Sequence, residues 1–181
     1  MARQIALLRG INVGGHKRVE MARLRELVRQ LGYRDVQSYV QSGNVVFTGS
    51  DESQETIARN LEAQLAASFG FEVPVVVRSR DELADVVRAN PLRDVATVPA
   101  RHHVLFLKEA ADLEGLATID PASHEPERFE VRGREIYLWT PAGMGNSRLA
   151  KALTEKRLGG VATARSWWTV EKLLALAKEG G

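Results

Sequence analysis

The residues whose types and spacing could do chemistry gather in the segment Arg9 to Arg18, RGINVGGHKR. Glycines there permit backbone angles closed to other residues and let a ligand approach the main chain. Cations follow them at the start of a predicted helix, where they oppose the helix dipole unless an anion binds. The alternative is a plain glycine-rich turn with solvated cations at its exit. The residues concerned are Gly10, Gly14, Gly15, His16, Lys17 and Arg18.

The segment does not match the two common nucleotide-binding patterns. Four residues separate Gly10 from Gly15, but His16 stands where a Walker motif requires Lys, and no Ser or Thr follows Lys17. The glycine spacing also fails the dinucleotide fingerprint. The binding interpretation therefore names only an anion, bearing phosphate or carboxylate, and the plain-turn interpretation stays open beside it.

Other catalytic chemistry finds little support. Cysteine is absent, which excludes disulfides, thiolate metal sites and cysteine nucleophiles. His102 and His103 are adjacent on a predicted strand, so their side chains should point to opposite faces and cannot easily share one metal ion. Ser42 lacks the G-x-S-x-G elbow of serine hydrolases. We expect no metal and no cofactor. An enzyme of unknown reaction remains an alternative, with its catalytic residues unknown.

The length and net charge of the chain further limit the classes of function that it could have. The chain has 181 residues and a net charge of only +2, so general nucleic-acid binding driven by bulk charge is not indicated. The N-terminus shows no signal-peptide pattern, and no apolar run is long enough to span a membrane. We expect a cytoplasmic protein without a membrane partner. Its oligomeric state stays open.

The first half alternates between strand and helix patterns. The unbroken apolar run at residues 5–8 predicts a strand covered on both faces. Pro74 places the fourth strand at a sheet edge, and Ser79 with Glu82 has the capping-box spacing of a helix start. The predicted elements are strands at 5–8, 36–41, 45–48 and 72–78, with helices at 21–31 and from Asp51 or Ser53 to Phe69.

The second half repeats this order. After the helix that starts at Ser79, strands are predicted at 102–108, 127–131, 135–140 and 161–165. Helices are predicted at 112–116, from Ser147 to Lys156, and at 170–178. Each half reads β-α-β-β-α-β, which predicts an α+β protein of two ferredoxin-like plaits, with antiparallel sheets and helices packed on one face. We expect subdomains at 1–80 and 81–181.

This topology predicts where the loop and a hairpin should lie. The first and third strands of such a plait are antiparallel neighbours. The segment leaving strand one and the turn joining strands two and three therefore share one end of the sheet. Converging donors there would suit a phosphate or carboxylate. The predicted ligand-binding residues are Arg9, Asn12, Gly14, Gly15, Lys17, Gln41, Ser42 and Asn44, with Arg18 beside them.

Three blocks, LLRGINVGG, YVQSGNVVF and TARSWWTVEKL, together resemble the bacterial family called domain of unknown function 1697. The likeness covers essentially the whole chain. It implies two ferredoxin-like subdomains and no particular activity. The family's last block usually reads Arg-Asn-Trp-x-Thr. Arg165, Trp167 and Thr169 match it, but Ser166 replaces the Asn, which would shorten or remove any binding role of that side chain.

The same block supplies secondary candidates. Arg165 and Trp167 could contact a ligand by stacking or cation–π interaction. Alternatively, a Trp anchors the last helix in the core and Thr169 caps it. A second alternative function is a single-stranded nucleic-acid binding module, which needs exposed aromatics on a sheet face. In the first sheet only Tyr39 and Phe47 could serve.

Overall fold

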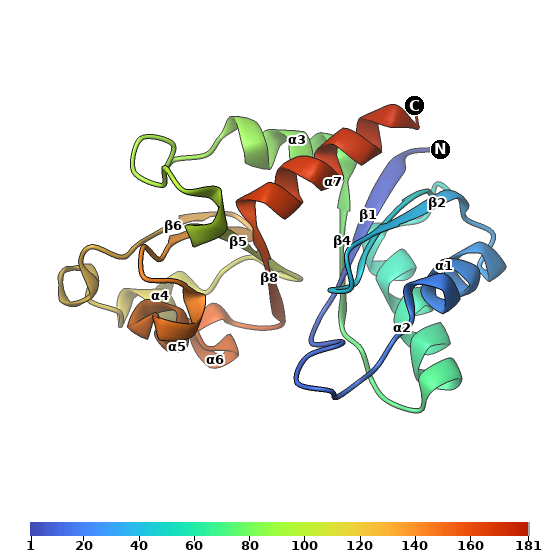
Figure 1. The fold of residues 1–181 in the computed structure, drawn as a ribbon, viewed down its shortest axis with the longest axis horizontal. Coiled ribbons are helices and arrows are strands. Elements are labelled where there is room, and N and C mark those ends of the chain that lie inside the picture. The colour runs from blue at the N-terminus through green and yellow to red at the C-terminus, as the bar shows by residue number, and fades with distance from the viewer. Residues whose placement is uncertain (181) are drawn as a thin grey trace. The chain divides into compact units, whose positions relative to one another are not determined.

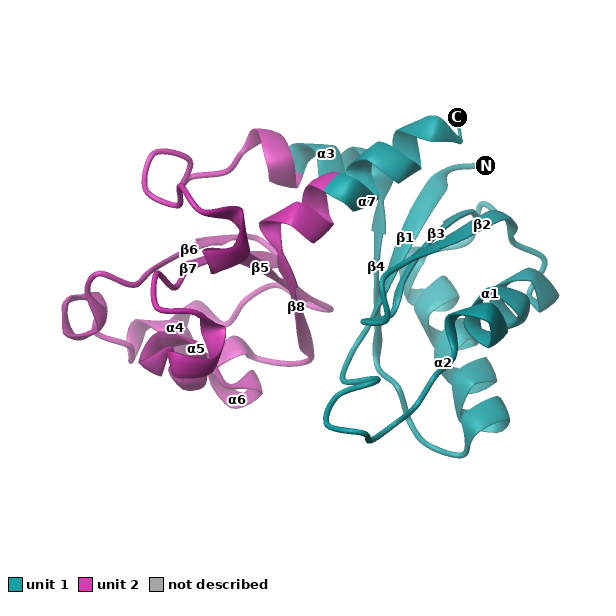
Figure 2. Cartoon of the chain, in the orientation of Figure 1, with its two compact units in different colours: residues 1–85, 172–181 teal, residues 86–171 magenta. Residues whose placement is uncertain are grey.

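The structure is a computed structural model that describes residues 1–180. The chain divides into two compact units, residues 1–85 with 172–181 and residues 86–171 (Figure 2). Each unit contains one four-stranded antiparallel sheet with helices packed on it. The fold is therefore α+β with two ferredoxin-like subdomains, as the alternation of patterns in the sequence predicts.

The sheet of the first unit has the strand order β2-β3-β1-β4, and every pair is antiparallel. Its two helices cover the same face of the sheet (Figure 1). The elements are β1 (Arg3–Leu8), α1 (Met21–Gln30), β2 (Arg34–Tyr39), β3 (Asn44–Thr48), α2 (Gln54–Phe69) and β4 (Val75–Ser79).

The central strand β1 explains the arrangement. All six of its residues are buried, because both faces of this part of the sheet are covered. Ala6 and Leu8 face the cluster formed with the helices, which includes Leu24 of α1 and Leu61 of α2. Burying one such aliphatic side chain contributes about 1.5–3 kcal/mol. Strand β4 lies at the sheet edge, as Pro74 predicts.

Local signals fix the helix ends of this unit. The Ser53 side chain accepts from the Thr56 N–H at the start of α2, and Gly70 ends that helix in the left-handed conformation at φ 76°. The next helix, α3 (Arg80–Arg88), has both halves of the predicted capping box. The Glu82 N–H donates to Ser79 Oγ at 3.2 Å, and the Ser79 N–H donates to Glu82 Oε2 at 2.8 Å.

The second unit repeats the topology with the order β6-β7-β5-β8, again fully antiparallel. Its core includes Leu105, Leu107, Ile136 and Leu138 on one sheet face. The elements are β5 (His102–Leu107), α4 (Leu113–Ala117), β6 (Arg128–Arg132), β7 (Glu135–Trp139), α5 (Arg148–Ala152), α6 (Glu155–Leu158) and β8 (Ala162–Ser166). Helix α7 (Trp167–Glu179) begins in this unit, and its residues from Lys172 onwards belong to the first unit.

Two helix predictions in this half need correction. The single helix expected from Ser147 to Lys156 is two short helices, α5 and α6. They separate because the Thr154 side chain accepts from the Arg157 N–H and so begins a new helix. The last helix begins at Trp167 rather than Val170.

Candidate functional site

The loop after β1 and the β2–β3 turn meet at one end of the first sheet, which confirms the predicted proximity. The pairing of β1 with β3 reaches Leu7 opposite Asn44. Just beyond it, the Leu8 N–H donates to the Gly43 carbonyl at 2.8 Å. The Asn12 side-chain amide then donates to the Gln41 carbonyl at 2.7 Å. Two segments about thirty positions apart in sequence are thereby hydrogen-bonded to each other.

Asn12 holds this arrangement together. Besides its bond to Gln41, its Nδ2 donates to the Val19 carbonyl at 2.9 Å, and its Oδ1 accepts from the Val19 N–H at 2.9 Å. Its own N–H donates to the Lys17 carbonyl at 3.1 Å. Asn12 also adopts φ 54°, a left-handed conformation that Asn tolerates better than most residues. The side chain is therefore a bridge between loop and turn.

The β2–β3 turn is equally well tied down. Asn44 is fully buried, and its Nδ2 donates to the Tyr39 carbonyl and to Ser42 Oγ, both at 2.9 Å. Gly43 has φ 83°, and a Cβ there would lie 2.7 Å from the Leu8 Cβ. Close packing and backbone angle both require glycine at this position. Val40, half exposed, is held at φ 50°, an unfavourable conformation for a β-branched residue.

The glycine-rich loop presents bare backbone to its surroundings. Gly10, Gly14 and Gly15 have φ of 70°, 58° and 77°, and Lys17 joins them at 48°. A Cβ added at Gly10 or Gly15 would meet no atom within 4 Å. These glycines are therefore required by the backbone angles and not by packing. In many proteins the backbone N–H groups of successive residues in a turn line a concave surface that binds anions.

The cations of the loop have different surroundings. Lys17 Nζ donates to the Glu72 carbonyl at 2.9 Å and lies 6.0 Å from the Phe71 ring centroid. The Arg9 N–H donates to the Pro74 carbonyl at 2.9 Å. Within residues 1–180, the exposed side chains of His16 and Arg18 make no hydrogen bond or ion pair. The charge most accessible to a ligand therefore lies at the end of the loop.

Helix α1 follows directly and begins without side-chain caps. Its N-cap residue Glu20 makes no capping side-chain hydrogen bond, and the first turn contains no acidic residue. The first N–H groups of a helix lack intrahelical partners, and the helix dipole makes this end attractive to anions. The sequence-predicted residues thus fall into two groups. Asn12 and Asn44 shape the site through their hydrogen bonds, while the glycine backbone and the exposed side chains of His16 and Arg18 face a ligand.

The secondary candidates Arg165 and Trp167 are both buried. Arg165 Nη1 donates to Thr163 Oγ1 at 2.6 Å and to the Ala164 carbonyl at 2.8 Å, and burial lowers the pKa of Arg165 to about 10. Trp167 stacks on His102, with ring centroids 4.5 Å apart and an angle of 12° between the planes. These side chains pack inside the unit, which favours the core alternative for Trp167.

Ser166 takes the capping position that Thr169 was expected to fill. It directly precedes α7, and its Oγ accepts from the Thr169 N–H at 3.4 Å and lies 3.1 Å from Thr169 Oγ1. Asn and Ser are comparable helix caps. Ser166, at the position where the sequence resemblance implies an Asn, therefore keeps a cap at the start of α7.

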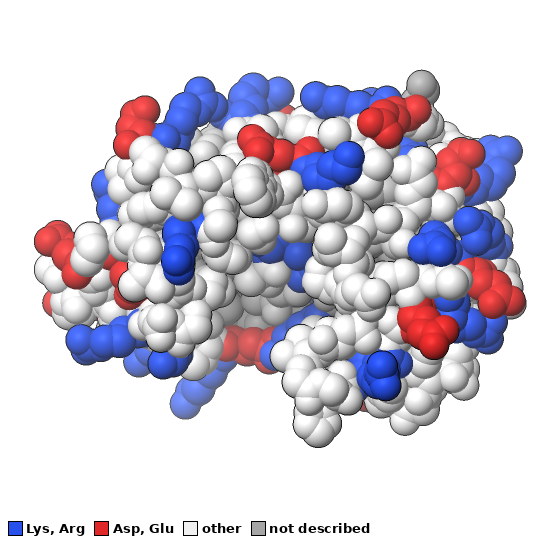
Figure 3. Space-filling view, in the orientation of Figure 1, with Lys and Arg blue, Asp and Glu red and all other residues white. Residues whose placement is uncertain are grey.

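Burial of aromatics bears on the nucleic-acid alternative. Phe47 is fully buried and stacks on Tyr33, with centroids 4.8 Å apart, so its ring cannot stack on a base. Tyr39 is only partly exposed. On the face seen in Figure 3, basic and acidic side chains are interspersed and form no continuous basic surface. No observation in the described residues specifically favours nucleic-acid binding.

Residues 1–180 contain neither a metal-binding cluster nor a membrane-spanning helix. Across residues 1–180, no three His, Cys, Asp or Glu side chains are grouped so that they could hold a metal ion. His102 and His103 follow the predicted alternation, since His102 pairs in register with Trp139 and His103 with Leu138. None of the helices in this described part has the length and apolar character needed to cross a bilayer.

Comparisons with known proteins support the family and the fold. A family model described as "Protein of unknown function (DUF1697)" matches residues 1–137. A solved structure, that of the conserved bacterial protein SP0830 from Streptococcus pneumoniae, is similar with a TM-score of 0.72 and 25% sequence identity. The likeness covers 97% of this chain and 98% of that one. No curated protein matches the chain.

Proposed function

Because the chain belongs to the DUF1697 family, whose description assigns no activity, we propose a function from the geometry of the site: the protein binds a small anionic ligand bearing phosphate or carboxylate at the loop of residues 9–18. The observation that carries the proposal is the open, positive-φ backbone of this loop, held in place by Asn12 beside the turn at Gln41. Asn12 and Lys17 also hold positive φ without being glycine, and strained positions of this kind cluster at ligand sites.

The predicted residues take distinct roles in this proposal. The N–H groups around Gly14 and Gly15 and at the start of α1 receive the anion. Lys17 and Arg9 supply positive charge, and Arg18 joins them from the loop exit. On the turn, Gln41 and Ser42 are exposed next to the loop. Asn12 and Asn44 hold the two segments in register without contacting the ligand.

The fold holds the positive charge of the Lys17 side chain in one position. Its Nζ is fixed by the Glu72 carbonyl, which neutralises no charge, so the ammonium keeps its full attraction for an anion. An exposed cation held in one geometry also loses less side-chain entropy on binding than a freely moving one. The charge of Lys17 is therefore available to the ligand at low entropic cost.

The test measures binding of inorganic phosphate and of phosphorylated metabolites to the full chain by thermal shift and calorimetry. A ligand at one hundred times its Kd should stabilise the folded protein by about 2.7 kcal/mol. The double variant Lys17→Met with Arg18→Met should weaken binding by about tenfold or more, the equivalent of about 1.4 kcal/mol. The matched control replaces Arg148 and Lys151, exposed residues of α5 in the second unit, by Met.

The outcome separates the proposal from its alternatives. Equal binding by both double variants would show that the loop is not the site. Binding of short oligonucleotides that exceeds that of phosphate and survives the loop substitutions would favour a nucleic-acid module elsewhere. Failure of every phosphorylated and carboxylated compound to bind would overturn the proposal.

A further inference from the structure

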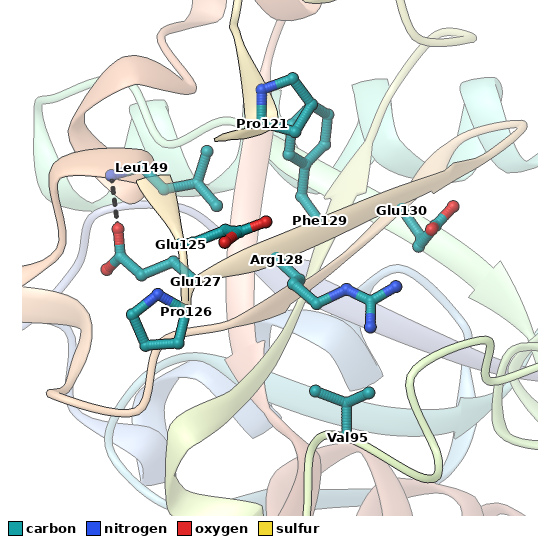
Figure 4. A pocket seen from close by; sticks show the side chains of 9 residues that line it. All are labelled: Val95, Pro121, Glu125, Pro126, Glu127, Arg128, Phe129, Glu130 and Leu149. Atoms are coloured by element: carbon teal, nitrogen blue, oxygen red, sulfur yellow. Dashed lines mark hydrogen bonds between the residues drawn. The ribbon is translucent and has the colours of Figure 1, made fainter. Parts of the chain in front are cut away.

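The second unit contains a cavity that no motif in the sequence indicates. It has a volume of about 800 Å³, within the range of about 300–1,000 Å³ that is usual for small-molecule sites. Figure 4 shows its lining, which comes from the segment before β5, the connection between α4 and β6, strand β6 itself and helix α5. All of these residues belong to the same compact unit.

The wall of the cavity is mainly apolar. Phe129 and Leu149 belong to the sheet-and-helix core of the unit and are fixed by that packing. Pro121 and Pro126 add rigid apolar surface on the connection, and Val95 lies on the opposite side in Figure 4. A wall of this kind favours a ligand with an apolar body.

Two of the carboxylates at the cavity already have partners. Glu127 Oε2 accepts from the Leu149 N–H at 3.1 Å, which joins the connection to the start of α5. Glu130 Oε2 lies 3.6 Å from Arg132 Nη1. Arg132 partly balances the charge of Glu130, whereas Glu127 bonds a neutral N–H and keeps its negative charge beside the cavity.

The remaining charges, Glu125 and Arg128, have opposite signs and no partner. Within residues 1–180 neither side chain makes a hydrogen bond or an ion pair, with each other or with any other group. Both line the same cavity, and in Figure 4 the Arg128 guanidinium extends away from Glu125 towards Val95. An acceptor and a donor thus line one cavity together with apolar side chains, an arrangement that complements a ligand carrying both charges.

We propose that this cavity binds a zwitterion of the amino-acid or short-peptide class with an apolar side chain. Its ammonium group bonds the Glu125 carboxylate, its carboxylate bonds the Arg128 guanidinium, and its side chain lies on Phe129, Pro121 and Leu149. Charge-assisted hydrogen bonds of this kind are the strong ones, and Arg suits carboxylates because its donors match their geometry. The site is independent of the anion site proposed for the first unit.

The experiment uses the full chain and the dipeptide L-leucyl-L-phenylalanine, followed by calorimetry and by NMR shifts of the Phe129 and Leu149 amides. N-acetylation removes the ammonium of the dipeptide, and C-amidation removes its carboxylate. Each change should weaken binding to the unsubstituted protein by about tenfold, which corresponds to about 1.4 kcal/mol. Amide shifts should be confined to residues that line the cavity.

Two variants assign each charge of the ligand to one residue. Glu125→Gln should weaken the free dipeptide about tenfold and bind the N-acetyl form as well as the free form. Arg128→Gln should likewise make the C-amide and the free form equal. Glu109→Gln and Arg148→Gln, exposed and outside the cavity lining, serve as controls that leave all three affinities unchanged.

Three outcomes would overturn the proposal. The first is no binding of the free dipeptide. The second is equal binding of the free dipeptide and the doubly blocked form, which would show apolar docking alone. The third is binding that neither variant changes. Because Glu125 and Arg128 are exposed and unpaired, their substitution leaves the core of the unit intact, and a folded variant is expected in each case.

Discussion

Replacing Asn12 by Ala tests whether this side chain joins the glycine-rich loop to the β2–β3 turn. The substitution removes three hydrogen bonds, two donated by Nδ2 and one accepted by Oδ1. Each contributes about 0.5–1.5 kcal/mol net. It also places Ala at φ 54°, where a non-glycine residue other than Asn or Asp costs about 1–2 kcal/mol. With each bond at about 1 kcal/mol, we expect a loss of about 4–5 kcal/mol in the free energy of unfolding.

Urea denaturation of the full chain, followed by far-UV circular dichroism, measures this loss. For a chain of this size about 1 kcal/mol lowers Tm by roughly 2–4 °C, so thermal unfolding should shift by about 8–20 °C. Amide hydrogen exchange locates the effect, because the Val19 N–H loses its acceptor and should exchange faster. Binding of phosphate should weaken in parallel.

Two further variants separate the contributions. Asn12→Gly loses the same three bonds but accepts the left-handed angle, so it should be more stable than Asn12→Ala by about 1 kcal/mol. The control is Asn146→Ala, an exposed residue whose one side-chain bond, to the Ala142 carbonyl, is 3.4 Å long. A loss at Asn12 no larger than that of the control, about 0.5 kcal/mol or less, would refute the reasoning.

The remaining predictions concern the second unit. Ser166→Ala should lower the free energy of unfolding by about 1 kcal/mol through loss of the cap on α7, while Ser166→Asn should keep it, as urea denaturation would show. Burial, with a smaller effect of the neighbouring His103, lowers the pKa of His102 to about 4. The unfolded chain then binds a proton that the folded chain excludes, so stability is full above pH 6.5 and falls as pH drops towards 4. His102→Phe should flatten this part of the curve, and an unchanged curve would contradict the assignment.

Much of the fold could be predicted because its signals are local. The unbroken apolar run in β1, the capping pair Ser79 and Glu82, and Gly70 at the end of α2 each act over a few residues. The edge strand β2 was predicted less well: it covers Arg34–Tyr39 instead of 36–41. Only one of its residues, Val36, is buried, so the apolar pattern that marks a strand is weak there.

The candidate site could be predicted in position but not in detail. Topology alone places the two segments at one end of the sheet. Whether a side chain contacts a ligand or the protein's own backbone depends on interatomic distances, which the sequence does not give. Asn12 and Asn44 have the amide groups expected of ligand contacts, yet their donors are taken by the backbone. The cavity of the second unit has no signature in the sequence, because its lining comes from several separate segments, none of which has a motif.

The two units also share a feature that sequence comparison alone could not reveal. Arg78 on β4 pairs in register with Ile5 on β1, and Arg165 on β8 pairs with Val104 on β5. Both arginines are buried, and they occupy equivalent positions next to the central strand of their sheet. A capping serine follows each of them at the step from strand to helix. Two identical residues are too few to show a repeat in the sequence, but the register of the sheets makes their equivalence explicit.

The two sheets have the same topology, so the units differ mainly in the connections between their elements. In the first unit the connection after β1 is the long glycine-rich loop, whereas in the second the cavity is lined largely by the connection between α4 and β6. Connections tolerate change because they carry little of the core, which is why binding residues concentrate there on a rigid scaffold. The two sites that we propose therefore differ in chemistry although the two sheets share one topology. Substitutions at Arg18 should leave dipeptide binding unchanged, and substitutions at Arg128 should leave phosphate binding unchanged.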